Sequence, residues 1–185
     1  MNIKSQIAPK GLEFKSNSFN TSDKCCTILT VVSYPKYIQP GYLASLTSMS
    51  GIKVVIKHIP LPFTVLRKML NKEIADLKQR YQETNDKTLQ ERISQDYESL
   101  EQFITQLASS QQKIYDFQMH IMITANSEEE LNQKKLQVKN YLGAMEMNAF
   151  PLRFEQESVF KSIIPIFPKQ AIEERIGTPI PAPTL

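Results

Sequence analysis

Glycine is scarce in this sequence of 185 residues, and none of the glycines cluster; they are Gly11, Gly41, Gly51, Gly143 and Gly177. A phosphate-binding loop needs clustered glycines, which let backbone N–H groups approach a phosphate, followed by a lysine. The sequence has no such loop and no G-x-G-x-x-G, H-E-x-x-H or Cys-x-x-Cys motif. We therefore expect no nucleotide or zinc site in this chain, and assign no catalytic, cofactor-binding or metal-ligating residue.

Cysteines and long apolar runs are also scarce. Cys25 and Cys26 are adjacent, which disfavours a disulfide between them and is not the spacing of a metal site. We expect two thiols that enter a strand in a reducing compartment. No apolar run approaches the roughly 20 residues that span a bilayer, and the first residues lack the apolar stretch of a secretory signal. The sequence predicts a soluble, cytoplasmic chain, with enough hydrophobic residues (41%) for a core.

The net charge of +3 is unevenly distributed. Residues 1–61 carry seven lysines and two acidic residues, whereas residues 62–185 carry 15 basic and 17 acidic side chains. A basic first third could bind anionic lipid or nucleic acid. Its lysines are dispersed rather than interleaved with aromatic residues, which favours ordinary solvated lysines; they are Lys4, Lys10, Lys15, Lys24, Lys36, Lys53 and Lys57.

The first third predicts a strand–helix–strand unit. After weak strand character at residues 12–19 and a turn at residues 20–23, residues 26–33 are apolar and β-branched, as in a buried strand. A short helix with Pro40 in its first turn buries Leu43 and Leu46, and Gly51 stops it. A strand over residues 52–59 follows, closed by Pro60 and Pro62.

Residues 63–111 predict a long antiparallel helical hairpin. Apolar residues recur at helical spacing in two stripes, separated by a polar break at residues 84–86, and the span contains neither glycine nor proline. The first stripe is Leu66, Leu70, Ile74, Leu77 and Tyr81; the second is Leu89, Ile93, Tyr97, Leu100, Ile104 and Leu107. Each helix would have roughly 20 residues and a length of about 30 Å. The stripes are expected to form an internal seam, although an exposed hairpin is also a plausible docking arm.

A second strand–helix–strand unit follows. Apolar and polar residues alternate over residues 115–124, which predicts a strand with one buried face. Ser127 and Glu130 form a capping box, and the helix behind it has an apolar face; Phe150, Leu152 and Phe154 then alternate in a strand that Pro151 places at an edge. Two such units predict an α+β fold, a ferredoxin-like split βαβ pair with the hairpin inserted and one sheet face covered by two helices.

Two constellations could carry chemistry. His58 and His120 both lie on predicted strands and could approach each other, but they lack the cysteine, carboxylate or nucleophile that zinc binding or catalysis needs. The run of three glutamates at residues 128–130 is explained by helix capping and the helix dipole. We expect a structural or exposed role for the two histidines and a capping role for the glutamates.

The order of landmarks resembles one family. These are a strand ending in Tyr34-Pro35, Pro40-Gly-Tyr-Leu43 opening a short helix, His58-Ile-Pro-Leu-Pro62, a Lys/Glu/Gln-rich hairpin, the 117–124 strand, Phe160-Lys-Ser-Ile-Ile-Pro165 and a proline-rich end, Arg175-Ile-Gly-Thr-Pro-Ile-Pro-Ala-Pro-Thr-Leu185. In this order, residues 11–185 resemble the N-terminal domain of the CagE/TrbE/VirB ATPases of conjugation and type IV secretion. The resemblance rests on order and spacing, without a catalytic motif.

The resemblance implies a domain organisation. Residues 1–10 would be a flexible N-terminus and residues 11–165 an α+β N-terminal domain. Residues 166–185 would be a proline-rich connector to an absent C-terminal ATPase domain; X-Pro pairs favour the extended backbone that a connector has. ATP and Mg²⁺ would bind that absent domain. The chain itself would be a non-catalytic assembly and docking domain, peripheral at the cytoplasmic face of the membrane. Its implied partners are inner-membrane channel components, its own ATPase domain and other copies of itself.

The rival hypothesis is a single-stranded nucleic-acid-binding module, since ferredoxin-like sheets can stack bases on exposed aromatic residues. Against it, Tyr115 and Phe117 share a predicted strand face with Met119, Ile121 and Ile123, which is typical of a core. A small self-contained enzyme would have only His58 and His120 to support it.

Overall fold

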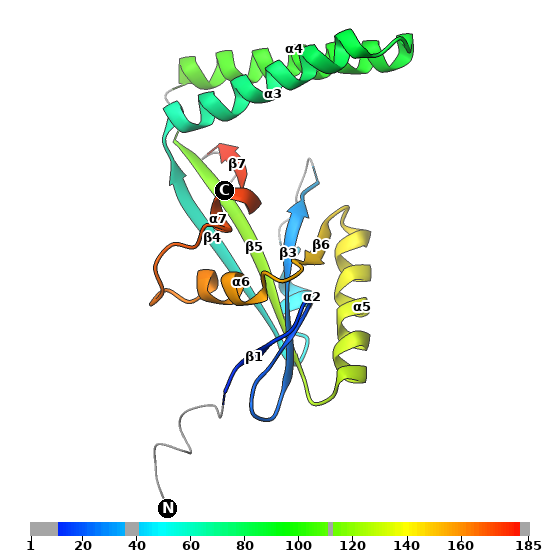
Figure 1. Ribbon diagram of the computed structural model, residues 1–185, viewed down its shortest axis with the longest axis vertical. Coiled ribbons are helices and arrows are strands. Elements are labelled where there is room, and N and C mark those ends of the chain that lie inside the picture. The colour runs from blue at the N-terminus through cyan, green and yellow to red at the C-terminus, as the bar shows by residue number, and fades with distance from the viewer. Residues whose placement is uncertain (1–10, 36–40, 111–112, 182–185) are drawn as a thin grey trace, which may run out of the picture. The chain divides into compact units, whose positions relative to one another are not determined.

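A computed structural model describes residues 11–35, 41–110 and 113–181 (Figure 1). The expected flexible N-terminus, Pro40 and the last four residues of the expected connector lie outside the described residues. The chain divides into two units, Met1–Lys57 with Phe117–Thr178 and His58–Asp116 with Pro179–Leu185.

The fold is α+β with an antiparallel sheet, as the alternation of sequence patterns predicts. The central strand β3 (Cys25–Ser33) pairs antiparallel with β5 (Ile114–Ala125) and with β6 (Asn148–Pro151). The strand order is β1-β2-β3-β5-β4, with β6 on β3 and β7 on β5. The remaining bounds are Glu13–Phe14 for β1, Phe19–Asn20 for β2, Ile52–Leu61 for β4 and Thr178–Pro181 for β7.

Short helix α2 (Ala44–Thr47) and Gly51 connect β3 to β4. Gly51 has a φ of 78°, and a Cβ atom there would overlap the carbonyl oxygen of Thr124, so only glycine suits this turn. The predicted strand after Gly51 is present but continues through Pro60 to Leu61. Since β4 ends the strand order, Pro60 can lie in it without a missing N–H donor breaking the sheet.

Helix α5 (Glu128–Ala144) begins where the capping box predicts. Its N-cap Ser127 accepts a hydrogen bond from the Glu130 N–H at 3.2 Å. The expected strand through Leu152 and Phe154 is wrong in its extent, because β6 ends at Pro151. Phe154 takes a left-handed φ of 59°, and its N–H donates to the carbonyl of Ser16 at 2.7 Å, which turns the chain away from β3.

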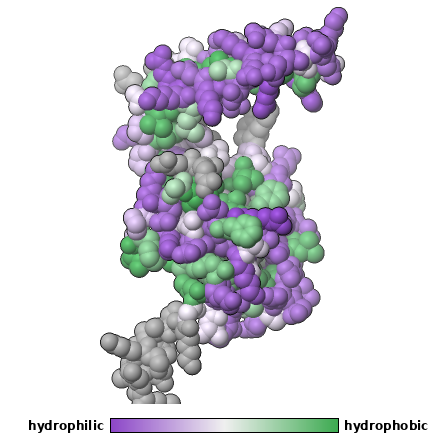
Figure 2. All heavy atoms as spheres, viewed as in Figure 1, coloured by the Kyte–Doolittle hydropathy of each residue, from purple (hydrophilic) through white to green (hydrophobic). Residues whose placement is uncertain are grey.

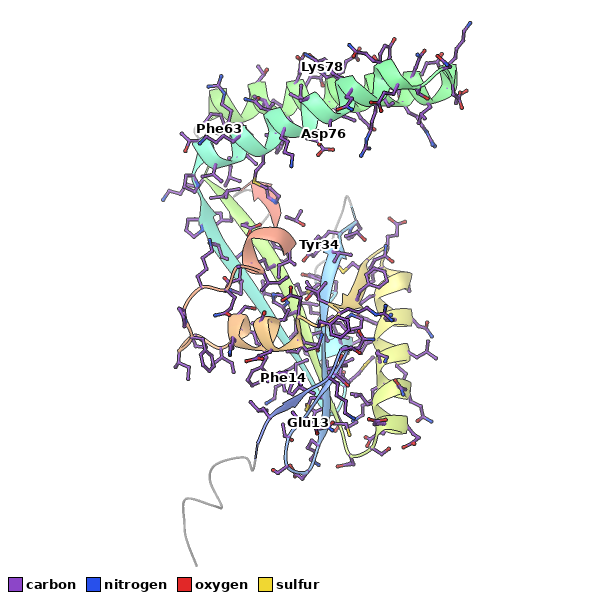
Figure 3. All side chains as sticks on the ribbon, viewed as in Figure 1. Glu13, Phe14, Tyr34, Phe63, Asp76 and Lys78 are labelled. Atoms are coloured by element: carbon purple, nitrogen blue, oxygen red, sulfur yellow. The ribbon has the colours of Figure 1, made fainter. Side chains whose placement is uncertain are left out.

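Both faces of the sheet are covered, whereas the sequence predicts cover on one face only. Helix α6 (Gln156–Ile163) lies across one face, where Val159 joins Phe19, Cys26 and Ile28 in an apolar cluster (Figure 1). Phe14, labelled in Figure 3, packs on this cluster with its ring centroid 5.3 Å from that of Phe19. Because strand residues alternate between faces, the buried residues next to Cys26 and Ile28 along β3 belong to the opposite face, which α5 covers; its buried residues are Leu131, Val138 and Leu142.

The segment expected to be a connector contains regular structure in its described part. Residues 173–176 form helix α7 (Glu173–Ile176), and β7 pairs with β5. Ile172 is buried in the same cluster as Val159 and anchors this segment.

The second unit consists mainly of α3 (Phe63–Glu83) and α4 (Lys87–Ser110), which pack against each other. They occupy the two stretches that the apolar stripes predict to be helical. Leu66, Leu107 and Ile114 form a buried cluster between the start of α3 and the end of α4, while Leu77 and Ile93 are buried nearer the α3–α4 turn. Within the ranges that the structure describes, no helix has both the length and the hydrophobicity to cross a membrane.

Candidate functional site

The first unit contains a group of polar side chains on the α6-covered face of the sheet. Gln118 and His120 alternate with core residues along β5, and both are fully buried. Lys57 on β4 and Glu173 at the start of α7 complete the group. A strand with one buried face would leave Gln118 and His120 in water. Residues 156–176 cover them instead, so the group is an unexpected feature.

Lys57 and Glu173 form the strongest interaction of this group. Lys57 Nζ lies 2.6 Å from Glu173 Oε2 and also donates to the carbonyl of Ser162 at 3.0 Å. Glu173 Oε1 accepts from the Gln170 N–H at 2.9 Å, and its backbone carbonyl accepts from Gln118 Nε2 at 2.7 Å. Burial alone would raise the pKa of Glu173, but the hydrogen bonds from Gln170 and Lys57 outweigh it and hold this pKa below its usual value.

His120 and Thr30 have the geometry of a base and a hydroxyl. His120 Nδ1 lies 3.1 Å from Thr30 Oγ1, and His120 Nε2 has no partner among the described residues. Burial, with Lys57 nearby, lowers the pKa of His120 to about 4, so the ring is neutral near pH 7. A general base must reach its substrate. Because His120 and Thr30 are both fully buried, this contact stabilises the core rather than presenting a reactive hydroxyl.

His58, which the sequence could bring near His120, does not join the polar group on the buried face. His58 is exposed, and neighbouring residues of a strand point to opposite faces. Lys57, rather than His58, is therefore the β4 residue that joins Glu173 and acts on the charge of His120. The structural role expected for His120 agrees with its burial.

The remaining candidates take part in local structure. Cys26 is buried, which raises the pKa of its thiol, and Cys25 begins β3 as predicted. Glu128 pairs with Lys15 at 2.8 Å. In a capping box Glu130 would accept from the backbone N–H of the N-cap, Ser127. It accepts instead from the N–H of Asn126, one residue earlier, at 2.8 Å, and it pairs with Lys134 at 2.9 Å. Among the described residues, no group of three or more histidine, cysteine or acidic side chains could hold a metal ion.

The α3–α4 pair offers the other candidate site. Figure 2 shows that its visible surface is largely hydrophilic, with apolar surface gathered near the start of α3. Val65 and Met69 are 43% and 46% exposed. Their spacing of four residues places both side chains on one helix face. We call these two residues the α3 apolar patch.

No model of a known protein family matches the sequence. No curated protein matches it either. The sequence does not predict the buried group around Lys57 and Glu173, because its members lie far apart in the chain. Only the alternation of Gln118 and His120 with apolar residues marks their strand, and it gives the wrong exposure for both.

Proposed function

We propose that this chain is a non-catalytic assembly and docking domain of a conjugation or type IV secretion ATPase. In this proposal it holds the motor at the cytoplasmic face of the membrane channel, and an ATPase domain follows it in a longer protein. The main support for the proposal is that the α3–α4 pair presents a large helical surface with an exposed apolar patch.

The strand order supports the ferredoxin-like fold that the two strand–helix–strand units predict. Strands β6, β3, β5 and β4 lie in this order, and helices α2 and α5 each follow the first strand of a strand–helix–strand unit. This is the order of a ferredoxin-like split βαβ pair. The α3–α4 pair would then be an insertion between its two halves.

The α3 apolar patch supports docking because a partner that covers Val65 and Met69 would remove their apolar surface from water. Burial of apolar surface is favourable and stabilises the association. Val65 and Met69 are followed by Lys72 one turn later, so a partner would meet an apolar surface bordered by positive charge. Hydrophobic contacts with a basic edge are suited to an amphipathic segment with acidic residues.

A transfer assay tests this proposal. The full-length gene, carrying Val65→Asp and Met69→Asp, is returned to a host whose own copy is deleted, and conjugative transfer is counted. We expect transfer to fall at least 100-fold, since two buried charges would oppose docking. Leu136→Asp is the matched control, because Leu136 is an exposed apolar residue of α5 (61% exposed). Equal transfer by both variants would remove the role of the α3 apolar patch.

Photocrosslinking identifies the partner directly. A benzophenone amino acid at position 65 or 69 should crosslink to a protein of the membrane fraction, whereas the same probe at position 136 should not. Crosslinks that are the same from all three positions contradict specific docking. The purified chain should also show no saturable ATP hydrolysis with Mg²⁺, and turnover abolished by one substitution would contradict the non-catalytic part.

Nucleic-acid binding receives no support from the described surface of β5. Phe117 is buried with Met119 and Ile121, and its ring packs on Tyr34 with centroids 5.2 Å apart, so it offers no face for a base. Binding to single-stranded DNA that weakens steeply with salt would favour this alternative instead.

A further inference from the structure

The α3–α4 pair leaves its apolar seam partly open. Four seam residues are buried, namely Leu66, Leu77, Ile93 and Leu107. Tyr81 and Leu89, which belong to the same stripes near the turn between the helices, remain exposed. Two helices alone touch along one narrow line, whereas a helix in a larger bundle has its whole apolar stripe covered. The seam is therefore wider than one pair of helices can cover.

A groove of about 250 Å³ runs along this open part of the seam. Its apolar lining residues are Leu77, Tyr81, Ile93 and Tyr97. A second depression, of about 560 Å³, also reaches Leu77 and Ile93 and is lined by charged residues from both helices; these are Arg80, Glu83, Arg92 and Asp96. The seam is thus accessible from two sides at the end of the pair that carries the turn.

The exposed charges of the two helices are complementary. Helix α3 carries five basic and three acidic residues, and α4 carries two basic and four acidic residues. In the described part of the chain no salt bridge joins α3 to α4, because every ion pair found lies in the first unit. Lys78 and Asp76 extend from opposite sides of α3 (Figure 3). Most of these charges therefore remain available to another molecule.

We infer that a second copy of this chain covers the groove, with α3 of each copy against α4 of the other. A two-fold axis parallel to the helices gives this contact and makes each helix antiparallel to both neighbours, as in a four-helix bundle. The basic helix of one copy then meets the acidic helix of the other twice. The half-open stripes of both copies become one core.

The dimensions of the helices are sufficient for such a contact. A helix of 21 residues is about 30 Å long, and two helices side by side are about 20 Å wide. Each copy can therefore bury on the order of 600 Å², or about 1,200 Å² in total, which is within the range of specific interfaces. This inference goes beyond the proposed function, because it concerns the groove and not the α3 apolar patch.

Sedimentation of the purified chain in low salt tests the inference, with two sets of charge reversals. The α3 set is Arg67→Glu, Lys78→Glu and Arg80→Glu, of which Lys78 lines the groove; the α4 set is Glu91→Lys, Asp96→Lys and Glu98→Lys. We expect the unchanged chain to dimerise and each set alone to weaken its homodimer at least tenfold. An equimolar mixture of the two sets should form a 1:1 heterodimer, because each basic helix again faces an acidic one.

The same substitutions combined in one chain are the matched control, and should restore the homodimer. A monomeric unchanged chain at about 100 μM would overturn the inference however the variants fold. A dimer that neither set weakens would overturn it as well, and so would an unchanged chain that stays monomeric while an amphipathic peptide from another protein binds in the groove. The proposed function fails separately, through normal transfer by the Val65→Asp, Met69→Asp variant.

Discussion

Removing Lys57 should destabilise the first unit strongly, because it leaves the Glu173 carboxylate buried without its cation. Glu173 is 5% exposed and Lys57 is 21% exposed, with 2.6 Å between Nζ and Oε2. Breaking a buried ion pair by removing one partner costs about 3–5 kcal/mol. Lys57 is partly exposed, so we expect the lower end, about 3 kcal/mol, for Lys57→Met. For a chain of this size that corresponds to a Tm lower by about 6–12 °C.

Urea unfolding followed by far-ultraviolet circular dichroism measures this loss, since the chain contains no tryptophan. Lys161→Met is the matched control. Lys161 also lies 2.6 Å from a carboxylate, that of Glu157, but both side chains are largely in water. An exposed pair of this kind contributes below about 0.5 kcal/mol. Adding Glu173→Gln to Lys57→Met should recover most of the loss, because the buried group is then neutral.

Equal effects of Lys57→Met and Lys161→Met would refute this reasoning, since the two pairs differ chiefly in burial. Failure of Glu173→Gln to recover stability would show that the lost contact with the Ser162 carbonyl, rather than the stranded charge, sets the cost. Hydrogen exchange should also rise in residues 170–176, because Glu173 connects this segment to β4 and β5.

Three further predictions concern single positions. Burial lowers the pKa of His120 to about 4, so the unfolded state takes up a proton near pH 6.5 and the folded state does not. The contribution of His120 to the free energy of unfolding is therefore present above about pH 6.5 and should fall by about 2 kcal/mol between pH 7 and pH 5. Urea titrations of His120→Leu should lack this pH dependence. Ser127→Ala removes the N-cap of α5 and should cost about 1 kcal/mol in the same assay, whereas an unchanged midpoint would assign capping to Glu130 alone. Gly51→Ala should lower the thermal midpoint because of its positive φ and the overlap with Thr124, while Gly143→Ala, with open space inside α5, should raise stability by about 0.5–1 kcal/mol; two changes of the same sign would contradict this difference.

Local chemistry accounts for the elements that the sequence predicts well. Ser127 and Glu130 specify the start of α5 through neighbouring atoms, and Gly51 specifies a turn through its own φ. The apolar spacing of Leu66 and Leu77 likewise specifies the inner face of α3. Each of these signals acts within about three helical turns, so it can be recognised without knowledge of the fold.

The buried polar group could not be predicted in this way. The exposure of His120 depends on residues 156–176, which cover β5 from a distant part of the chain. Pro168 and the later prolines favour extended backbone locally, yet Ile172 packs into the core and Glu173 finds Lys57. Contacts with distant residues determine the structure of this segment. X-Pro pairs indicate only the local backbone conformation, so they do not predict those contacts.

A single side chain completes the outer edge of β3. Strand β2 pairs with Cys25 and Cys26, and β6 pairs from Leu29 onward. Between them the Ile28 N–H donates to Gln156 Oε1 at 2.9 Å, and Gln156 Nε2 donates to the Ile28 carbonyl at 3.1 Å. A primary amide thus substitutes for one peptide unit of a missing strand. Gln156→Glu would keep an acceptor for the Ile28 N–H but remove the donor to the Ile28 carbonyl, so a change of one functional group in a fully buried side chain would leave a peptide group of the central strand half unsatisfied.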